Sequence, residues 1–140
     1  MSPEENKRIV RRIPMEAFNQ GRLTVLDEVI SEDFVNRNAM PGMADRGVEA
    51  INQLVTAIRT AFPNIKYTLD AEIAEGDKVV HMATARGTNS GEFMGIPPTE
   101  KSATWTEMHI VRIVNGKCVE HWGQVDMLGI MQQLGLAPAA

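Results

Sequence analysis

The dipeptide Asn115-Gly116 separates two alternating stretches of the chain, residues 102–114 and 117–126. Both central residues of a type I′ turn need a positive φ, and Asn-Gly is the short sequence that meets this need best. The dipeptide therefore predicts a β-hairpin with a two-residue turn. Such a turn also fixes which residues face each other across the strands, so the hairpin constrains the fold strongly.

Regular pairing from this turn gathers polar and aromatic side chains on one face of the hairpin, because side chains alternate across a strand. The residues expected on that face are Trp105, Glu107, His109, Trp122, Gln124 and Asp126. The residues expected on the opposite face are Met108, Ile110, Val119 and Val125, with Arg112 and His121 near its end. The polar and aromatic face is suited to a small-molecule pocket, and the apolar face to packing against helices or a partner subunit.

Length and composition are those of a single globular domain, residues 1–140. The 23% of charged and 44% of hydrophobic residues are ordinary values, and a net charge of −4 without a basic stripe argues against nucleic acid. No apolar run approaches the ~20 residues that span a bilayer, and the first residues do not resemble a secretory signal. Because Cys118 is the single cysteine, no internal disulfide is expected, which favours the cytoplasm.

The first half of the chain carries helical signals. A capping-box pattern at residues 2–5 starts a first helix, which Pro14 is expected to kink or break. Residues 24–30 favour a short second helix and residues 34–38 a short strand. Apolar residues then recur at helical spacing over residues 47–62, the clearest helix of the chain.

Beyond this helix the apolar residues alternate with a period of two, as in strands. Strands are expected over residues 65–71 and 79–88, followed by a long loop over residues 91–101, the hairpin and a closing helix. Helices followed by antiparallel strands predict an α+β fold with helices packed on one face of a curved sheet. Such a sheet encloses a conical cavity, whose mouth is expected near residues 41–46 and the long loop.

An ordered run of motifs extends through most of the chain, from about residue 34 onward. The motifs are Ala61-Phe62-Pro63, Glu75-Gly76-Asp77-Lys78-Val79, Gly87-Thr88, Gly91-Glu92-Phe93-Met94-Gly95-Ile96-Pro97-Pro98-Thr99, Arg112-Ile113, Asn115-Gly116-Lys117, Glu120-His121-Trp122, Asp126, Leu128-Gly129 and Gln133-Leu134-Gly135. In this combination the chain resembles the SnoaL-like polyketide (ester) cyclases of the NTF2-like superfamily. The resemblance implies a conical α+β barrel with helices on the concave face of the sheet, a cofactor-free pocket and a homodimer or higher homo-oligomer.

The resemblance also implies a reaction. Characterised cyclases of this kind close a ring of an anthracycline-precursor ester by intramolecular aldol condensation, with an aspartate as general acid and base. Asp126 is the position that matches this aspartate. Two positions depart from the family pattern: Asn89 replaces a histidine, which argues against an imidazole role there, and Glu100 replaces a glycine at the pocket rim, which bears on substrate choice.

Asp126 and His109 are the candidate catalytic residues. Aldol closure needs a base for a proton next to a carbonyl and an acid for the new alkoxide. A carboxylate held dry between Trp105 and Trp122 would be a better base near neutral pH, although Asp126 is equally suited to cap the closing helix. His109 can donate a hydrogen bond to a substrate enolate or serve as a structural residue of the strand.

The other candidates would bind substrate. Asn36 and Asn38 alternate on one side of the early strand and can bind ligand carbonyls, or serve turn chemistry beside the following loop. The indoles can stack on a flat ligand or simply fill the core. The remaining candidates are Trp105, Glu107, Trp122 and Gln124. The histidines show no metal-ligand pattern, and no nucleotide-binding loop or nucleophile elbow is found.

The sequence thus predicts a cofactor-independent cyclase or isomerase acting on a small aromatic or hydrophobic, polyketide-like ester. Two alternatives stay open: a non-catalytic small-molecule-binding protein, and an epoxide-hydrolase-like enzyme that activates water with an aspartate. The hairpin register places no arginine beside Asp126 for such a hydrolase. A β-bulge in either strand of the hairpin would move part of the face assignment to the other side of the sheet.

Overall fold

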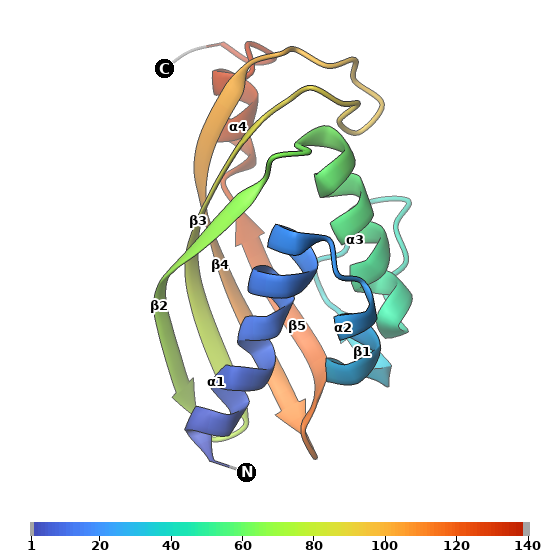
Figure 1. Cartoon of the computed structure of the whole chain (residues 1–140), viewed down its shortest axis with the longest axis vertical. Helices are drawn as coiled ribbons and strands as arrows, with labels where there is room; N and C mark the ends of the chain where they lie inside the picture. Colours follow the sequence, from blue (N-terminus) through green and yellow to red (C-terminus); the bar gives the residue numbers. More distant parts are fainter. Residues whose placement is uncertain (1, 139–140) are drawn as a thin grey trace.

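The computed structural model describes residues 2–138 of the chain. Five strands form one curved sheet in the order β1-β5-β4-β3-β2, and the helices cover its concave face (Figure 1). β1 (Ile30–Asn36) runs parallel to β5 (Lys117–Val125), and every other neighbouring pair is antiparallel. The predicted α+β fold, with a helical layer on a curved sheet, is confirmed.

The other elements follow the predicted order closely. They are α1 (Pro3–Arg12), η1 (Ile13–Phe18), α2 (Thr24–Val29), α3 (Gly47–Ala61), β2 (Lys66–Glu75), β3 (Lys78–Thr88), β4 (Ser102–Val114) and α4 (Met127–Gln133). The first strand begins earlier than the predicted residues 34–38, directly after α2. Within the described residues, no helix is long and apolar enough to cross a membrane.

The first helix begins as predicted and then changes its winding. The Oγ atom of Ser2 accepts a hydrogen bond from the backbone N–H of Glu5 at 3.1 Å, which caps α1. Pro14 has no N–H group and cannot continue the α-helical hydrogen-bond ladder. The π-helical segment η1 contains this proline, so the helix continues with a wider turn instead of breaking.

The core lies between the helical layer and the concave face of the sheet. Ile51 and Val55 are buried on the sheet side of α3, as their helical spacing predicts. Val79 and Ala83 of β3 and Trp105 of β4 are buried on the facing side of the sheet. Alternation along these strands therefore determines which side chains point toward the helices.

The hairpin turn is as predicted. Asn115 and Gly116 have φ values of 50° and 77°, the positive values that a type I′ turn requires. Val114 faces Lys117 directly across the turn. The local turn sequence thus places β4 and β5 side by side.

A β-bulge at Val119 then changes the register of the hairpin. Ile113 still faces Cys118, but Arg112 faces Glu120, so Val119 has no partner of its own on β4. One extra residue turns every later side chain of β5 to the other face of the sheet. The predicted pairing is therefore wrong beyond the first two residue pairs.

The shift corrects several face assignments. His109 faces Gly123 and not Trp122, and Glu107 faces Val125 and not Gln124. The β5 residues that share the concave face with Trp105, Glu107 and His109 are His121, Gly123 and Val125. The sequence predicts Trp122 in the pocket, but Trp122 faces Ile110 on the outer side of the sheet. It predicts His121 and Val125 on the outer side, but both border the cavity.

The buried side chain of Asn89 makes four hydrogen bonds that hold the long loop between β3 and β4. Its Nδ2 donates to the carbonyl oxygens of Ala61 at 3.1 Å and Gly91 at 2.8 Å. Its Oδ1 accepts from the backbone N–H and the hydroxyl of Thr99, both at 2.9 Å. All the hydrogen-bonding capacity of the amide is used, which explains asparagine at this fully buried position. At the second departure from the family pattern, Glu100 has a φ of 62°, a conformation that favours glycine.

Candidate active site

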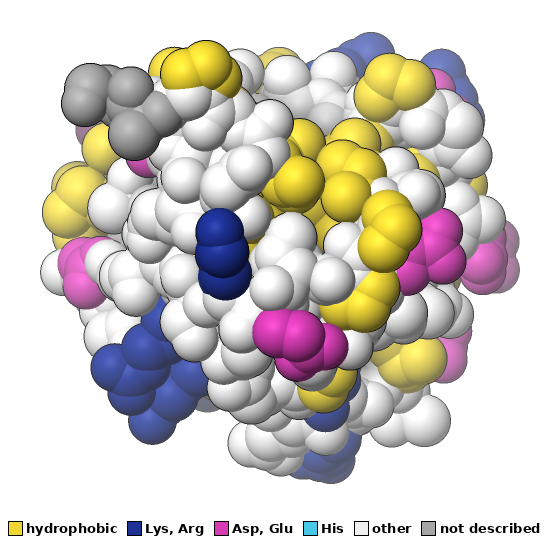
Figure 2. Space-filling view, turned by 90° about the horizontal axis from the view of Figure 1, so that it is seen from above, with side chains coloured by type: hydrophobic (Ala, Val, Ile, Leu, Met, Phe, Trp, Pro, Cys, Tyr) yellow, Lys and Arg dark blue, Asp and Glu magenta, His cyan; other side chains and the backbone are white. Residues whose placement is uncertain are grey.

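A cavity of about 500 Å³ lies between the helical layer and the concave face of the sheet. Its size is typical of a small-molecule site. Side chains from α1, η1 and α3 make most of its wall apolar, while the sheet contributes the polar groups. Met40 and Met43, from the loop after β1, also border it, so the cavity reaches the predicted mouth region. Figure 2 shows hydrophobic side chains gathered on the adjoining surface, over the β3–β4 loop and the end of α3.

Most of the predicted site residues border this cavity. They are Asn36, Asn38, Trp105, Glu107, His109 and Gln124. Gln124 lies at the exposed end of β5. Trp122 and Asp126 do not line the cavity, and a role for Trp122 as a pocket wall is wrong because the bulge turns it outward.

Asp126 lies at the start of α4 and is exposed. Its Oδ1 accepts a hydrogen bond from the backbone N–H of Gly129 at 2.9 Å. The interpretation of Asp126 as a helix cap is therefore confirmed. Its catalytic role stays a prediction, and the carboxylate would have to leave this cap to reach the cavity.

Glu107 is buried in the sheet wall of the cavity, with 6% of its surface exposed. Its Oε2 accepts a hydrogen bond from the indole N–H of Trp105 at 2.7 Å and another from the hydroxyl of Tyr67 at 3.3 Å. Burial, reinforced by the Glu107 carboxyl group, raises the pKa of Tyr67 well above its ordinary value, so the phenol keeps its proton. Two neutral donors thus hold one oxygen of Glu107 in place.

The second oxygen of Glu107 contacts a histidine pair. Oε1 lies 2.8 Å from Nε2 of His109, and Nδ1 of His109 lies 2.8 Å from Nε2 of His121. The two imidazoles stack with ring centroids 5.0 Å apart. A Cβ atom at Gly123 would lie 2.5 Å from Nδ1 of His109, so glycine leaves the space that the paired rings occupy.

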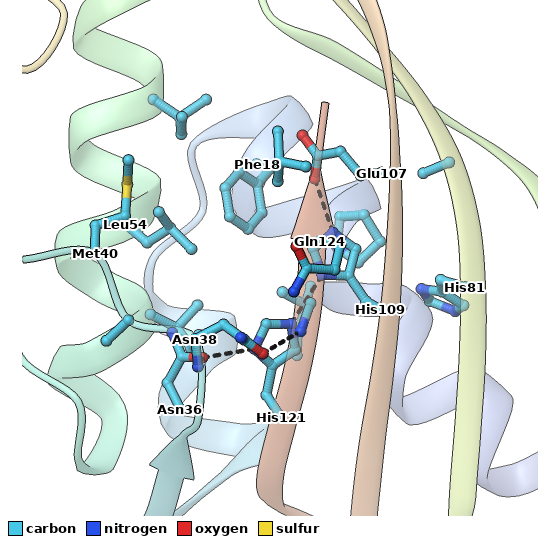
Figure 3. A pocket seen from close by; sticks show the side chains of 18 of the residues that line it. Phe18, Asn36, Asn38, Met40, Leu54, His81, Glu107, His109, His121 and Gln124 are labelled. Carbon is cyan, nitrogen blue, oxygen red and sulfur yellow. Dashed lines mark hydrogen bonds and ion pairs between the residues drawn. The ribbon is translucent and has the colours of Figure 1, made fainter. Parts of the chain in front are cut away.

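His121 extends this row of contacts to β1 (Figure 3). Its Nδ1 lies 2.7 Å from Oδ1 of Asn36, which also accepts the backbone N–H of Asn38 at 3.2 Å. Burial, together with the neighbouring His109, lowers the pKa of His121 to about 3, so this imidazole is neutral at pH 7. A continuous polar chain therefore runs from Glu107 through both histidines to Asn36.

The two asparagines are engaged within the protein. The side-chain oxygen of Asn36 accepts the backbone N–H two residues further on, at Asn38, which is the asparagine turn predicted as one alternative for this segment. Oδ1 of Asn38 accepts the backbone N–H of Gly123 at 2.7 Å and ties the end of β1 to β5. Binding of ligand carbonyls by these residues stays a prediction, and both border the cavity.

His81 pairs with His109 across β3 and β4 but stands apart from the polar chain (Figure 3). Its Nε2 lies 3.1 Å from Oε2 of Glu72, whose other oxygen binds Arg11 at 2.7 Å. Burial lowers the pKa of His81, although Glu72 opposes this shift. This cluster joins α1 to the sheet. Burial also raises the pKa of the Cys118 thiol to about 12, so the cysteine stays protonated.

The sequence matches one known protein family over most of its length. The family model described as SnoaL-like polyketide cyclase matches residues 8–134. The chain belongs to this family. Its predicted membership is confirmed, and the SnoaL-like fold extends over nearly the whole chain.

Relatives of this SnoaL-like protein include named ester cyclases. Nogalonic acid methyl ester cyclase of Streptomyces nogalater is 32% identical over 120 residues, which cover 85% of this chain and 90% of that protein. Aklanonic acid methyl ester cyclase DnrD of Streptomyces peucetius is 32% identical over 129 residues, covering 91% and 88%. The structure of TsrD from Streptomyces laurentii superposes with a TM-score of 0.88 at 26% identity, covering 98% of this chain and 99% of TsrD.

Among the residues of the polar chain, sequence reasoning missed His121 as a cavity residue. One signal pointed to the observed arrangement: Gly123 interrupts a strand, and glycine inside a strand often marks a bulge or a close approach. Here the close approach is that of the imidazoles of His109 and His121 to Gly123, which faces His109 across the strands. Tyr67 was also missed, because its strand offered no pairing signal that would place it beside Glu107.

Proposed function

We propose that this chain is a cyclase that closes a ring in a polyketide-like ester, using Glu107 and His109 as its proton-transfer pair. The observation that carries the proposal is the 2.8 Å contact between Oε1 of Glu107 and Nε2 of His109 in the wall of an apolar cavity. An intramolecular aldol reaction needs one proton removed next to a carbonyl and one delivered to the new alkoxide. A carboxyl–imidazole pair can perform both transfers, so the proposed reaction is cofactor-independent.

The cavity supports a substrate with an extended apolar body. Its volume of about 500 Å³ and its mostly apolar wall suit a flat, multi-ring ester held with one polar edge against the sheet. Closing the apolar wall around the substrate excludes water and strengthens electrostatic contacts at the reacting atoms. The two relatives are named for methyl ester substrates, nogalonic acid methyl ester and aklanonic acid methyl ester, which supports an ester substrate here.

The hydrolase alternative needs a tight cluster of an aspartate, an arginine and an asparagine around one water molecule. In the described part of the chain, Arg37 is the one arginine that borders the cavity. Its Nε lies 2.7 Å from Oε2 of Glu120, on the outer side of β5. This contact directs the guanidinium away from Glu107, and the site therefore favours the cyclase.

Turnover of an anthracycline-precursor methyl ester, followed by absorbance, separates the two acid–base assignments. His109→Gln removes the imidazole, and we expect the rate to fall about 100-fold, the usual contribution of a general acid or base. Asp126→Asn keeps an acceptor for the cap of α4, and we expect its rate to stay near that of the wild type. The opposite pattern would assign the proton transfers to Asp126. A wild-type protein that binds the ester without converting it would support the non-catalytic alternative.

We also propose that a second copy of the chain covers the outer face of the sheet. Ile73, Met82, Met108 and Ile110 form an outer apolar patch there, on three neighbouring strands. Met108 is 57% exposed and faces Met82 directly. A contiguous exposed apolar patch is typical of an interaction surface, and the sheet gives it the flat shape that a symmetric homodimer can use.

Met108→Glu should convert this dimer to a monomer, because the variant places a charge in the centre of the outer apolar patch. Light scattering coupled to size exclusion measures the mass directly. Met94→Glu is the matched control, since Met94 is 54% exposed but lies in the loop between β3 and β4. A monomeric wild-type protein, or equal masses for wild type and Met108→Glu, would contradict the proposed interface.

A further inference from the structure

The directions of the hydrogen bonds in the polar chain can be assigned from its end at β1. The backbone N–H of Asn38 only donates, so the Asn36 atom that it contacts at 3.2 Å is the side-chain oxygen. The same oxygen lies 2.7 Å from Nδ1 of His121. Because an amide oxygen only accepts, Nδ1 of His121 carries the hydrogen.

The direction continues through the two imidazoles. His121 is neutral, since burial lowers its pKa to about 3. A neutral imidazole has one N–H group, so Nε2 of His121 is bare and accepts a hydrogen bond. Its partner at 2.8 Å is Nδ1 of His109, which therefore donates.

This direction leaves Nε2 of His109 facing Oε1 of Glu107 at 2.8 Å. A neutral His109 beside an ionised Glu107 would bring two lone pairs together at this distance. One proton must therefore lie between the two atoms, on the carboxyl group or on the imidazole. Glu107 and His109 thus share one proton. The other hydrogen bonds of the polar chain are already satisfied by the neutral side chains.

We propose that Asn36 is a positioning residue that keeps this proton on Glu107 and His109 by fixing the tautomer of His121. Without its oxygen, His121 can carry the hydrogen on Nε2 and donate to Nδ1 of His109. His109 then carries its own hydrogen on Nε2 and donates to an ionised Glu107. Every contact between the three side chains is satisfied in this alternative with one proton fewer.

Within the described residues, Asn36 is the side-chain hydrogen-bond partner of His121 besides His109, so it is placed to fix the tautomer of His121. The titratable groups that face the chain from neighbouring strands are Tyr67 on β2, His81 on β3 and Arg37 after β1. Tyr67 keeps its proton, His81 is bonded to Glu72, and Arg37 is paired with Glu120. The cavity residues of α1, η1, α3 and α4 are apolar.

Nitrogen-15 NMR of the histidine rings tests the tautomers directly, because protonated and bare ring nitrogens have well-separated shifts. In the wild type we expect His121 to be protonated on Nδ1 and bare on Nε2. Asn36→Leu has the same branched side-chain shape with the same number of heavy atoms but no acceptor, and we expect it to exchange these two assignments. Asn36→Asp keeps an oxygen acceptor and should keep the wild-type tautomer. The signals of His81 are identified by their loss in His81→Gln.

The pH–rate profile provides the catalytic readout, which rests on the proposed function. Asn36→Leu should lose activity on the alkaline side at a lower pH than the wild type, because its three side chains satisfy every mutual contact with one proton fewer. A purely structural role for Asn36 would lower the rate equally at all pH values and leave the tautomer unchanged. An Nδ1-protonated His121 in Asn36→Leu would overturn the proposal. Absence of turnover in the wild type would overturn the proposed function alone, because the NMR assignment does not depend on turnover.

Discussion

Glu107→Gln should reduce cyclisation by about 100-fold or more while leaving the protein folded. The glutamine amide has nearly the shape of the carboxyl group that it replaces. Its oxygen can accept from Trp105 and Tyr67, and its NH₂ group can donate to Nε2 of His109, so the contacts of Glu107 are kept. The variant loses only the ability to give up and take back a proton.

The measurement combines turnover of the methyl ester with the melting temperature of each variant. Glu72→Gln is the matched control, because Glu72 is also a strand carboxylate bonded to a histidine, His81, but does not line the cavity. We expect Glu72→Gln to lower the melting temperature, through the loss of its pair with Arg11, and to keep its activity. Full activity in Glu107→Gln would remove the carboxyl group from the mechanism, and an unfolded variant would show that the amide cannot replace it in the chain.

Local sequence patterns predicted the elements of this fold well because local chemistry determines them. The turn at Asn115-Gly116 follows from two positive φ values, and the start of α1 follows from the cap at Ser2. The bulge at Val119 lies where β5 has a second partner strand. β5 pairs with β4 on one side and in parallel with β1 on the other, where the register also shifts, between Ile30 and Val35. No pattern within the hairpin specifies a partner strand from so far along the chain.

The same distinction explains which parts of the site were predicted. Glu107 and His109 are two residues apart on one strand, so alternation alone places them on one face. His121 reaches that face only because of one extra residue in β5. For Asp126, a helix cap and a catalytic carboxylate have the same sequence signature, and only the position of the cavity favours the cap. The sequence thus predicted the polar groups that β4 contributes to the cavity wall. The bulge in β5 determined which residue of β5 meets them.

The stability of the protein should decrease as the pH falls from about 6.5 to about 4.5, because His121 is held neutral in the folded state and His81 binds its proton less readily there than in the unfolded chain. The pKa of His121 is lowered to about 3, and burial also lowers the pKa of His81. In the unfolded chain both titrate near pH 6.5. Below that pH the unfolded chain binds a proton at His121 that the folded chain does not, so His121 removes up to about 1.4 kcal/mol of stability per pH unit. His81 acts in the same direction. Glu16, Glu72 and Glu120 have lowered pKa values and act in the same direction, but only near and below their ordinary value of 4.5.

Urea unfolding at several pH values within this window measures the contribution of His121. His121→Gln cannot bind the proton in either state, so its free energy of unfolding should fall by about 2 kcal/mol less between pH 6.5 and 4.5 than that of the wild type. Glu16→Gln is the control, since a surface carboxylate should leave the slope in this window nearly unchanged. Equal slopes for His121→Gln and the wild type would mean that His121 binds its proton in the folded state. An imidazolium at this position would donate from both nitrogens, and the shared proton assigned to Glu107 and His109 would no longer be required.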